Sequence, residues 1–162
     1  MNRCHQPQRA EIVVGVDGTA RCRRAVEFAA REAVLRDADL VAVMAVADGA
    51  GAGSSRGLET GRIEAAGHRL RQFLESVGTG GADVTLVVTT LPTADALIDR
   101  SRFAELLVLG GTAGAVTAPA SVSGRCLAEA SCPVVVIRSG RQQRPSPDGV
   151  RHAARRRLVG QT

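Results

Sequence analysis

The chain contains no lysine, because all 21 of its basic residues are arginine. A Walker A loop contacts the nucleotide phosphates through a lysine, a pyridoxal enzyme forms its Schiff base on one, and a protein kinase places one in its nucleotide site. The absence of lysine therefore excludes all three mechanisms.

Aromatic residues and long apolar runs are also scarce. Only 2% of residues are aromatic, with no tryptophan or tyrosine, whereas 44% are hydrophobic, so the core must consist of Val, Leu, Ile and Ala. This composition favours thin layers of helix on sheet. No apolar run approaches the roughly 20 residues of a membrane-spanning helix, and residues 1–10 lack the apolar centre of a signal peptide. We therefore expect a cytoplasmic protein.

The few cysteines and histidines show no metal-binding pattern. The four cysteines form no CxxC pair, and the three histidines lie far apart in the sequence. This spacing predicts neither a zinc site nor a disulfide framework, and we expect buried or inert thiols. The residues concerned are Cys4, Cys22, Cys126, Cys132, His5, His68 and His152.

The net charge of +5 is confined to the C-terminal segment. Residues 141–162 contain six arginines and one aspartate, which account for the whole net charge of the chain. With two prolines and few apolar residues, residues 139–162 are predicted to form a disordered basic tail, and residues 1–10 a disordered N-terminus. The tail offers no aromatic residue for base stacking, so we expect no specific nucleic-acid binding.

Apolar runs alternate with helical patterns between these two segments. Strict alternation of buried strands with helices predicts an α/β fold with an open, five-stranded, doubly wound parallel sheet of Rossmann-like type over residues 11–138. The expected strands are 11–16, 40–46, 84–88, 106–109 and 134–137, and the expected helices are 21–36, 58–77, 93–102 and 122–130. A flexible loop is expected over 47–57.

A stretch rich in small residues follows the apolar run 106–109. Gly110 and Gly111 are predicted to end that strand, and Ser121-Val122-Ser123 opens the next helix. Glycines allow backbone amides to approach a ligand closely, and a helix N-terminus favours an anion. An ordinary strand-to-helix turn is the alternative.

Asp17 follows the first predicted strand. In a doubly wound sheet the ligand lies beyond the carboxyl ends of the strands, where the strand order reverses. If strands 11–16 and 106–109 flank the reversal, Asp17 and the 110–121 loop face one crevice. Asp17 then accepts hydrogen bonds from ligand hydroxyls, or it caps the helix that follows it.

These segments resemble the universal stress protein family. The likeness rests on Val16-Asp17-Gly18-Thr19, on the strand LLVLG, on Ser121-Val122-Ser123 and on the closing Cys132-Pro133-Val134-Val135-Val136-Ile137-Arg138. It implies a small cytoplasmic stress-response domain with a five-stranded sheet. Members of this family usually dimerise, often through the last strand, and many of them bind ATP.

The family's ATP signature is Gly, two residues, Gly, nine residues, then Gly followed by Ser or Thr. By register, its first glycine corresponds to Gly110 and its serine to Ser121, although only ten residues separate them, and alanines replace two glycines. A shifted register aligns three glycines but places Arg125 at the Ser/Thr position, so the first register is preferred. The resemblance implies these nucleotide-binding residues: Asp17, Val46, Gly110, Gly111, Gly114, Ser121, Val122 and Ser123.

The sequence thus leads to two hypotheses for function. The first is weak binding of an adenine nucleotide, ATP or AMP, with or without magnesium. The second is an interaction module of the same fold that binds no nucleotide. A dedicated enzyme is disfavoured because no Ser-His-Asp set or dinucleotide fingerprint is present, although slow ATP hydrolysis stays open. The apolar last strand, Val134–Arg138, predicts a homodimer if it lies at a sheet edge.

Overall fold

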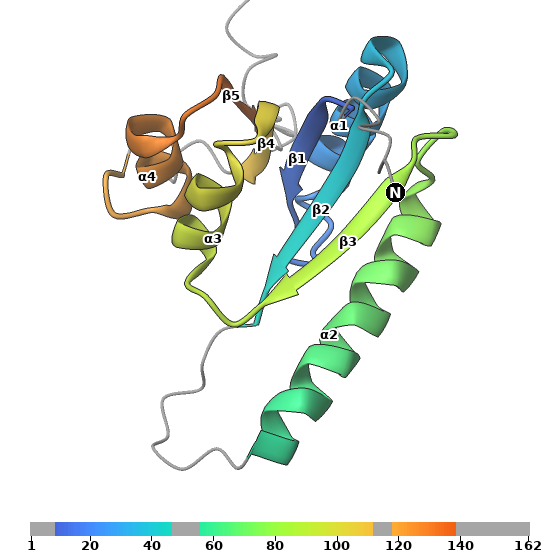
Figure 1. Ribbon diagram of the computed structural model, residues 1–162, viewed down its shortest axis with the longest axis vertical. Coiled ribbons are helices and arrows are strands. Elements are labelled where there is room, and N and C mark those ends of the chain that lie inside the picture. Colours follow the sequence, from blue (N-terminus) through green and yellow to red (C-terminus); the bar gives the residue numbers. More distant parts are fainter. Residues whose placement is uncertain (1–8, 47–55, 112–117, 139–162) are drawn as a thin grey trace, which may run out of the picture.

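In the computed structural model, strands and helices alternate along the chain (Figure 1). The structure describes residues 9–46, 56–111 and 118–138. The two predicted disordered segments lie outside these residues, apart from Arg9 and Ala10, and so does Gly114. The elements are β1 (Glu11–Gly15), α1 (Arg23–Arg36), β2 (Asp39–Ala45), α2 (Arg56–Val77), β3 (Val84–Thr89), α3 (Thr93–Arg100), β4 (Ala104–Gly111), α4 (Val122–Glu129) and β5 (Val134–Arg138).

The strands form one parallel sheet in the order β3-β2-β1-β4-β5. This confirms the predicted fold class. From β1 the chain moves outward through β2 to β3, then crosses back to β4 on the other side of β1. The reversal therefore lies between β1 and β4, and the carboxyl ends of these two strands meet there, as the crevice hypothesis required.

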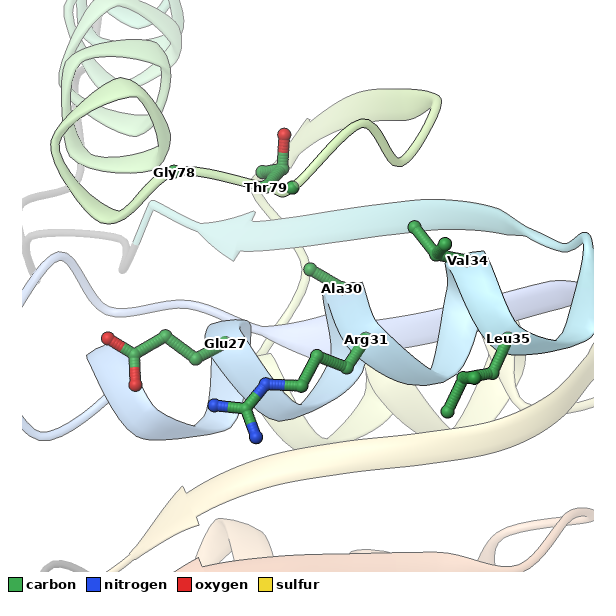
Figure 2. A pocket seen from close by; sticks show the side chains of 8 residues that line it. Glu27, Ala30, Arg31, Val34, Leu35, Gly78 and Thr79 are labelled. Carbon is green, nitrogen blue, oxygen red and sulfur yellow. The ribbon is translucent and has the colours of Figure 1, made fainter.

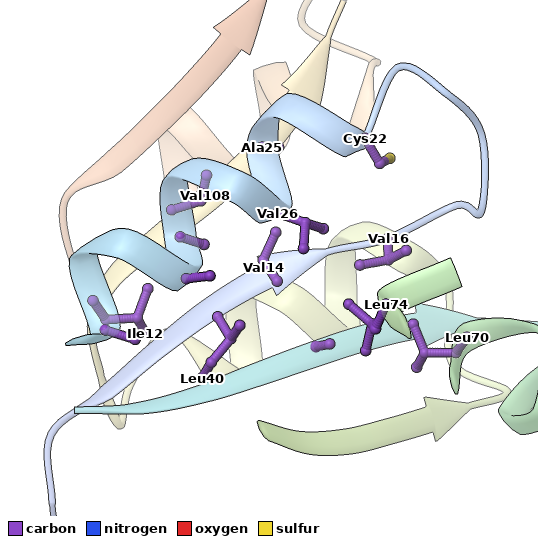
Figure 3. Packing of buried hydrophobic residues seen from close by; sticks show 14 of the residues in the cluster. Ile12, Val14, Val16, Cys22, Ala25, Val26, Leu40, Leu70, Leu74 and Val108 are labelled. Carbon is purple, nitrogen blue, oxygen red and sulfur yellow. The ribbon is translucent and has the colours of Figure 1, made fainter. Parts of the chain in front are cut away.

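Both faces of the sheet are buried by helices. Ile12 and Val14 of β1 pack in a cluster with residues of α1 and α2, whereas Val13 packs in a second cluster with residues of α3 and α4. Figure 1 shows the same division, and Figure 3 shows the first cluster. Each fully buried Val or Leu contributes about 1.5–3 kcal/mol, so the unbroken apolar runs of the central strands are explained by burial on both sides.

Several predicted boundaries shift by one or two residues, and the shift at β4 bears on the site. Gly110 and Gly111 were predicted to follow this strand, but they are its last two residues and pair with Ile137 and Arg138 of β5. The loop expected over 47–57 is shorter, since α2 already begins at Arg56. The first turn of α2 therefore contains Gly57. Relative to alanine, a glycine lowers the stability of a helix by only about 1 kcal/mol, and a helix that packs along the sheet tolerates this loss.

The last helix, α4, is buried on one narrow side. Cys126 is fully buried, whereas Val122 and Leu127 are 38% and 48% exposed. The helix has only eight residues and packs mainly against α3 and β5, so one turn supplies most of its buried surface. No helix in the described part of the chain is both long enough and apolar enough to cross a membrane.

Candidate functional site

Asp17 lies directly after β1, where it orders the turn that leads into α1. Its Oδ1 accepts hydrogen bonds from the Thr19 backbone N–H (2.8 Å), the Thr19 hydroxyl (2.7 Å) and the Cys22 thiol (2.8 Å). Partial burial by itself raises the pKa of Asp17, but the hydrogen bonds from Cys22 and Thr19 outweigh burial and hold the pKa below its ordinary value. The carboxylate is therefore ionised at neutral pH.

These contacts leave the second carboxylate oxygen available. The hydrogen bonds found for the Asp17 side chain within the described residues all end on Oδ1. Asp17 does not cap α1, because the N-cap of that helix is Cys22 and no side chain accepts a hydrogen bond there. One oxygen orders the turn before α1, and the other forms no hydrogen bond within the described residues.

Cys22 completes this turn. Its side chain is 5% exposed, its thiol donates to Asp17 Oδ1, and its sulfur accepts from the Asp17 backbone N–H at 3.4 Å. Burial, followed by the hydrogen bond to Asp17, raises the pKa of Cys22 to about 12. The expectation of burial is confirmed for Cys22 and also for Cys126, which is fully buried and whose pKa burial raises to about 11.

Gly110 brings β4 close to the same turn. A Cβ atom at this position would lie 3.1 Å from the Arg21 carbonyl oxygen and 3.2 Å from the Cys22 Cα. Because both neighbours are backbone atoms, they cannot rotate away as a side chain can. Glycine at this position therefore lets the carboxyl end of β4 pack directly on the start of α1.

The N-terminus of α4 is capped by Ser121. The Ser121 hydroxyl accepts a hydrogen bond from the Gly124 backbone N–H at 2.9 Å and donates one to the Ala118 carbonyl at 2.7 Å. This confirms Ser121 as a capping residue. A side chain at Gly124 would collide with the Ala118 carbonyl oxygen, so glycine is required there by packing.

Four of the predicted site residues surround one hollow of about 220 Å³. Asp17 comes from the β1–α1 turn and Gly110 from β4, while Val122 and Ser123 come from the first turn of α4. Ser123 is only 6% exposed. The hollow lies at the reversal of the strand order, so the structure brings together residues about 100 positions apart, as the sequence predicted.

The remaining predicted residues lie elsewhere or have other roles. Val46 lines a different hollow, beside α2, and Gly111 pairs with Arg138 in the sheet. Gly114 is outside the described residues. In the alternative register Arg125 would take the place of the Ser or Thr, but its guanidinium bonds to Asp95 at 2.7 Å, so the geometry favours the register that begins at Gly110.

Sequence reasoning missed several residues of this region. Cys22, Thr93 and Leu97 line the hollow with Asp17, and Arg69 and Gln72 of α2 line a neighbouring hollow of about 510 Å³ that Asp17 also borders. The 510 Å³ volume is within the range of small-molecule sites. In the sequence, the spacing of polar residues along the predicted helix 58–77 was the feature that indicated a polar side containing Arg69 and Gln72.

A separate hollow of about 430 Å³ lies between α1 and the turn after α2 (Figure 2). Val34 and Leu35, which are 51% and 78% exposed, border it together with Gly78. The turn leads into the start of β3, so this hollow opens toward the amino edge of the sheet. Its exposed lining is mainly apolar, and Glu27, Arg31 and Thr79 also border it.

No group of residues suited to hold a metal ion occurs in the described ranges. The chemistry available at the carboxyl edge is therefore that of one ionised carboxylate, the free amides of a helix N-terminus and a close-packed glycine. This combination suits a ligand with hydroxyl groups and an anionic group. The class defined by the fold and site is a doubly wound α/β domain with a ligand crevice at the strand-order reversal.

The universal stress protein family model matches residues 9–138, and the chain belongs to that family. No curated protein sequence matches it. Solved structures of the family share its fold. One is a universal stress protein family member from Burkholderia pseudomallei, 26% identical, with a TM-score of 0.56 over 81% of this chain and 97% of that one.

Two further solved structures contain nucleotides. The universal stress protein from Archaeoglobus fulgidus in complex with dAMP is 23% identical, with a TM-score of 0.52, and the match covers 81% of this chain and 99% of that one. A family protein from Arabidopsis thaliana with AMP bound is 18% identical, with a TM-score of 0.55, and the match covers 86% and 99% of the two chains. At these identities the likeness shows the fold.

Proposed function

We propose that this chain binds an adenine nucleotide, AMP or ATP, at the carboxyl edge of its sheet between β1 and β4. The observation that carries the proposal is the meeting of Asp17, Gly110 and the first turn of α4 around one hollow. The dAMP in the Archaeoglobus structure and the AMP in the Arabidopsis structure support the choice of an adenine nucleotide.

This hollow and its neighbour suit the parts of the ligand. The N-terminal amides of α4 and the positive end of its dipole favour the phosphate. The open oxygen of Asp17 accepts hydrogen bonds from the ribose hydroxyls. The base extends out of this hollow past Ala45, which borders both hollows, toward Val46 in the neighbouring hollow beside α2. Magnesium bound with ATP would be held mainly by the phosphates, since the described residues contain no group of three or more His, Cys, Asp or Glu side chains that could hold a metal ion.

Titration calorimetry with AMP, and with ATP in the presence and absence of magnesium, tests this proposal. We expect measurable binding that Asp17→Ala weakens by roughly tenfold, the worth of one charged hydrogen bond. Asp99→Ala is the matched control, because Asp99 is an exposed carboxylate on α3 that lines none of these hollows. Absence of heat at millimolar nucleotide would disprove the proposal.

We further propose that the chain acts by binding rather than by dedicated catalysis, as a cytoplasmic stress-response protein. The described residues offer one carboxylate near Gly110 but no activated nucleophile, since the Cys22 thiol is protonated at neutral pH. Release of phosphate from ATP, followed over hours, should be slow or absent. Cell fractionation tests the location.

We propose in addition that the chain forms a homodimer through β5. This strand lies at the edge of the sheet and pairs only with β4. An apolar edge strand with unpaired backbone groups favours pairing with a second strand. A dimeric interaction module that binds no nucleotide is the second candidate function, and the calorimetry above separates the two.

A further inference from the structure

The hydroxyl of Ser123 is buried beside the hollow at β4 without a hydrogen-bond partner. Ser123 is 6% exposed and lines the 220 Å³ hollow, yet its side chain forms no hydrogen bond in the part of the chain that the structure describes. Buried hydroxyl groups normally have a partner. A group bound in the hollow would supply one.

Two backbone amides at the start of α4 are open on the same side. The Ser121 N–H donates to the Ala118 carbonyl at 3.0 Å, and the Gly124 N–H donates to the Ser121 hydroxyl at 2.9 Å. Of the first four amides of the helix, this leaves those of Val122 and Ser123, for which the described residues provide no acceptor. These are the two residues of α4 that line the hollow.

The N-terminus of α3 borders the same hollow. Its first residue, Thr93, lines the hollow together with Leu97, which lies one turn further along the helix. The N-cap residue is Pro92, and no side chain caps this end of α3. The amide and hydroxyl of Thr93 are therefore further donors, and a second positive dipole end lies at the hollow.

An ion pair between the two helices neutralises the acidic residue in the first turn of α3. Asp95 Oδ1 accepts a hydrogen bond from Arg125 Nη2 of α4 at 2.7 Å, and neither residue lines the hollow. The pair also joins the first turns of α3 and α4. Among the described residues that line the hollow, only Asp17 is charged at neutral pH, and it lies at the β1 side.

We propose that the N-termini of α3 and α4 bind the phosphate of the ligand between them, with Thr93 and Ser123 as its hydrogen-bonding side chains, so that nucleotides with a terminal phosphate monoester are preferred. This inference rests on the proposed nucleotide function. A phosphate monoester has three terminal oxygens and carries about 1.5 to 2 negative charges at pH 7. A diester has two such oxygens and one charge, so it uses fewer donors and gains less from the two dipoles.

The test compares AMP with the methyl ester of its 5′-phosphate and with adenosine by calorimetry on the full chain. The three compounds share base and ribose, so their differences report on the phosphate alone. We expect the wild type to bind AMP roughly tenfold more tightly than the methyl ester, as one charge-assisted contact provides. Adenosine should bind more weakly than either.

Thr93→Pro removes both donors of Thr93 at a position that accepts proline. Proline is favoured as the first residue of a helix, and Pro92 already has φ −52° and ψ 136°, the extended conformation of a residue before proline. This variant should bind AMP roughly tenfold more weakly than the wild type, with adenosine affinity unchanged within about twofold. Thr93→Ser keeps both donors and is the matched control.

The outcomes separate the two proposals. Equal binding of AMP and its methyl ester by the wild type overturns this inference, as does a Thr93→Pro variant that binds AMP normally or loses AMP and adenosine equally. If AMP still binds the wild type and Asp17→Ala weakens it, the proposed function then stands alone. If AMP does not bind, both proposals are overturned. Because the first comparison uses only wild-type protein, it does not depend on whether a variant folds.

Discussion

The turn after β1 shows how one carboxylate can serve both structure and ligand binding. Thr19 and Cys22 donate to a single oxygen of Asp17, which fixes the turn that delivers Arg21 and Cys22 to the end of β4. These donors favour the ionised side chain. Asp17 is thereby placed and kept charged before any ligand arrives, which lowers the ordering cost of binding.

Asp17 should make stability depend on pH in the acid range. Its pKa is lower in the folded protein than its ordinary value of 3.8, so the unfolded chain binds the proton more tightly. Its contribution is therefore complete above about 3.8 and is lost as the pH falls through the folded-state pKa. Denaturant unfolding should show Asp17→Ala about 1 kcal/mol less stable than wild type at pH 7, with the gap narrowing as the pH falls below the ordinary value of 3.8 and through the folded-state pKa.

The exposed Asp99 again provides the control for this measurement. Asp99→Ala should change the free energy of unfolding by less than about 0.5 kcal/mol at either pH, because exposed side chains contribute little. A gap between wild type and Asp17→Ala that is the same at pH 7 and pH 2.5 would contradict the role given to the Asp17 hydrogen bonds.

The buried thiols should resist alkylation in the native protein. A pKa of about 12 for Cys22 and about 11 for Cys126, against an ordinary 9.0, leaves very little thiolate at pH 8. Since the thiolate is the nucleophile, iodoacetamide should modify both residues at least about a hundredfold more slowly than in denatured protein. Peptide mass spectrometry measures this. Equal rates for native and denatured Cys22 would be incompatible with its buried contact to Asp17.

At the scale of elements, β4 and α4 form the site because their facing ends are closely packed. Gly110 stays in the strand and lies against the backbone of the β1–α1 turn. Ser121 and Gly124 fix the start of α4, so that Ser123 faces the hollow. Gly110, Ser121 and Gly124 thus determine the path of the backbone at the end of β4 and the start of α4. They also leave the helix N-terminus in a form that favours an anion.

Alanine should have opposite effects at two glycines. Gly110→Ala forces a Cβ toward backbone atoms 3.1 and 3.2 Å away and should cost about 1–3 kcal/mol of stability. Gly61→Ala, in the interior of α2 with nothing within 4 Å of the added Cβ, should stabilise the protein by up to about 1 kcal/mol. Denaturant melts of the two variants provide the comparison. Destabilisation by Gly61→Ala would show that α2 is less regular than described.

Loss of the α4 cap should also be measurable. Ser121→Ala removes the acceptor of the Gly124 N–H and should cost about 1 kcal/mol, a fall in melting temperature of about 2–4 °C. Ser121→Asp retains an acceptor at this position and is the matched control. If the two variants melt together, the hydrogen bond to Gly124 contributes no net stability.

At the scale of the molecule, the edge strand β5 determines how copies of the chain could assemble. The Leu107 N–H donates to the Pro133 carbonyl at 3.0 Å, and Leu107 is paired with Val134. In a parallel pair, hydrogen bonds to the neighbour come from alternate residues, so the backbone groups of Val134 and Val136 point away from β4. Those groups are available to a second chain.

Proline at position 136 should therefore break the proposed dimer and leave the sheet intact. Val136→Pro removes an outward N–H, and an edge strand tolerates proline there. Light scattering at tens of micromolar should give a dimer mass for the wild type and for the control Val136→Thr, and a monomer mass for Val136→Pro with folding retained. A monomeric wild type would rule out assembly through β5 at that concentration.

The sequence by itself determined the order of elements and the class of fold. A strand buried on both faces needs an unbroken apolar run, a crossover helix needs a helical stripe, and strict alternation of the two favours a parallel, doubly wound sheet. The meeting of Asp17 with the 110–121 stretch followed from the sequence only on the condition that β1 and β4 flank the reversal. Doubly wound sheets occur in more than one strand order, so it was the fold that placed β1 beside β4.

Only the tertiary structure decided what the polar residues face. The spacing along α2 distinguishes its buried side from its polar side, but it does not show that Arg69 borders a hollow shared with Asp17. Likewise, no pattern showed that Gly110 and Gly111 continue β4, because their conformation depends on pairing with β5. Hydrophobic periodicity indicates which side of a helix or strand is buried. The neighbours of a polar side chain depend instead on the distances and orientations between the packed elements.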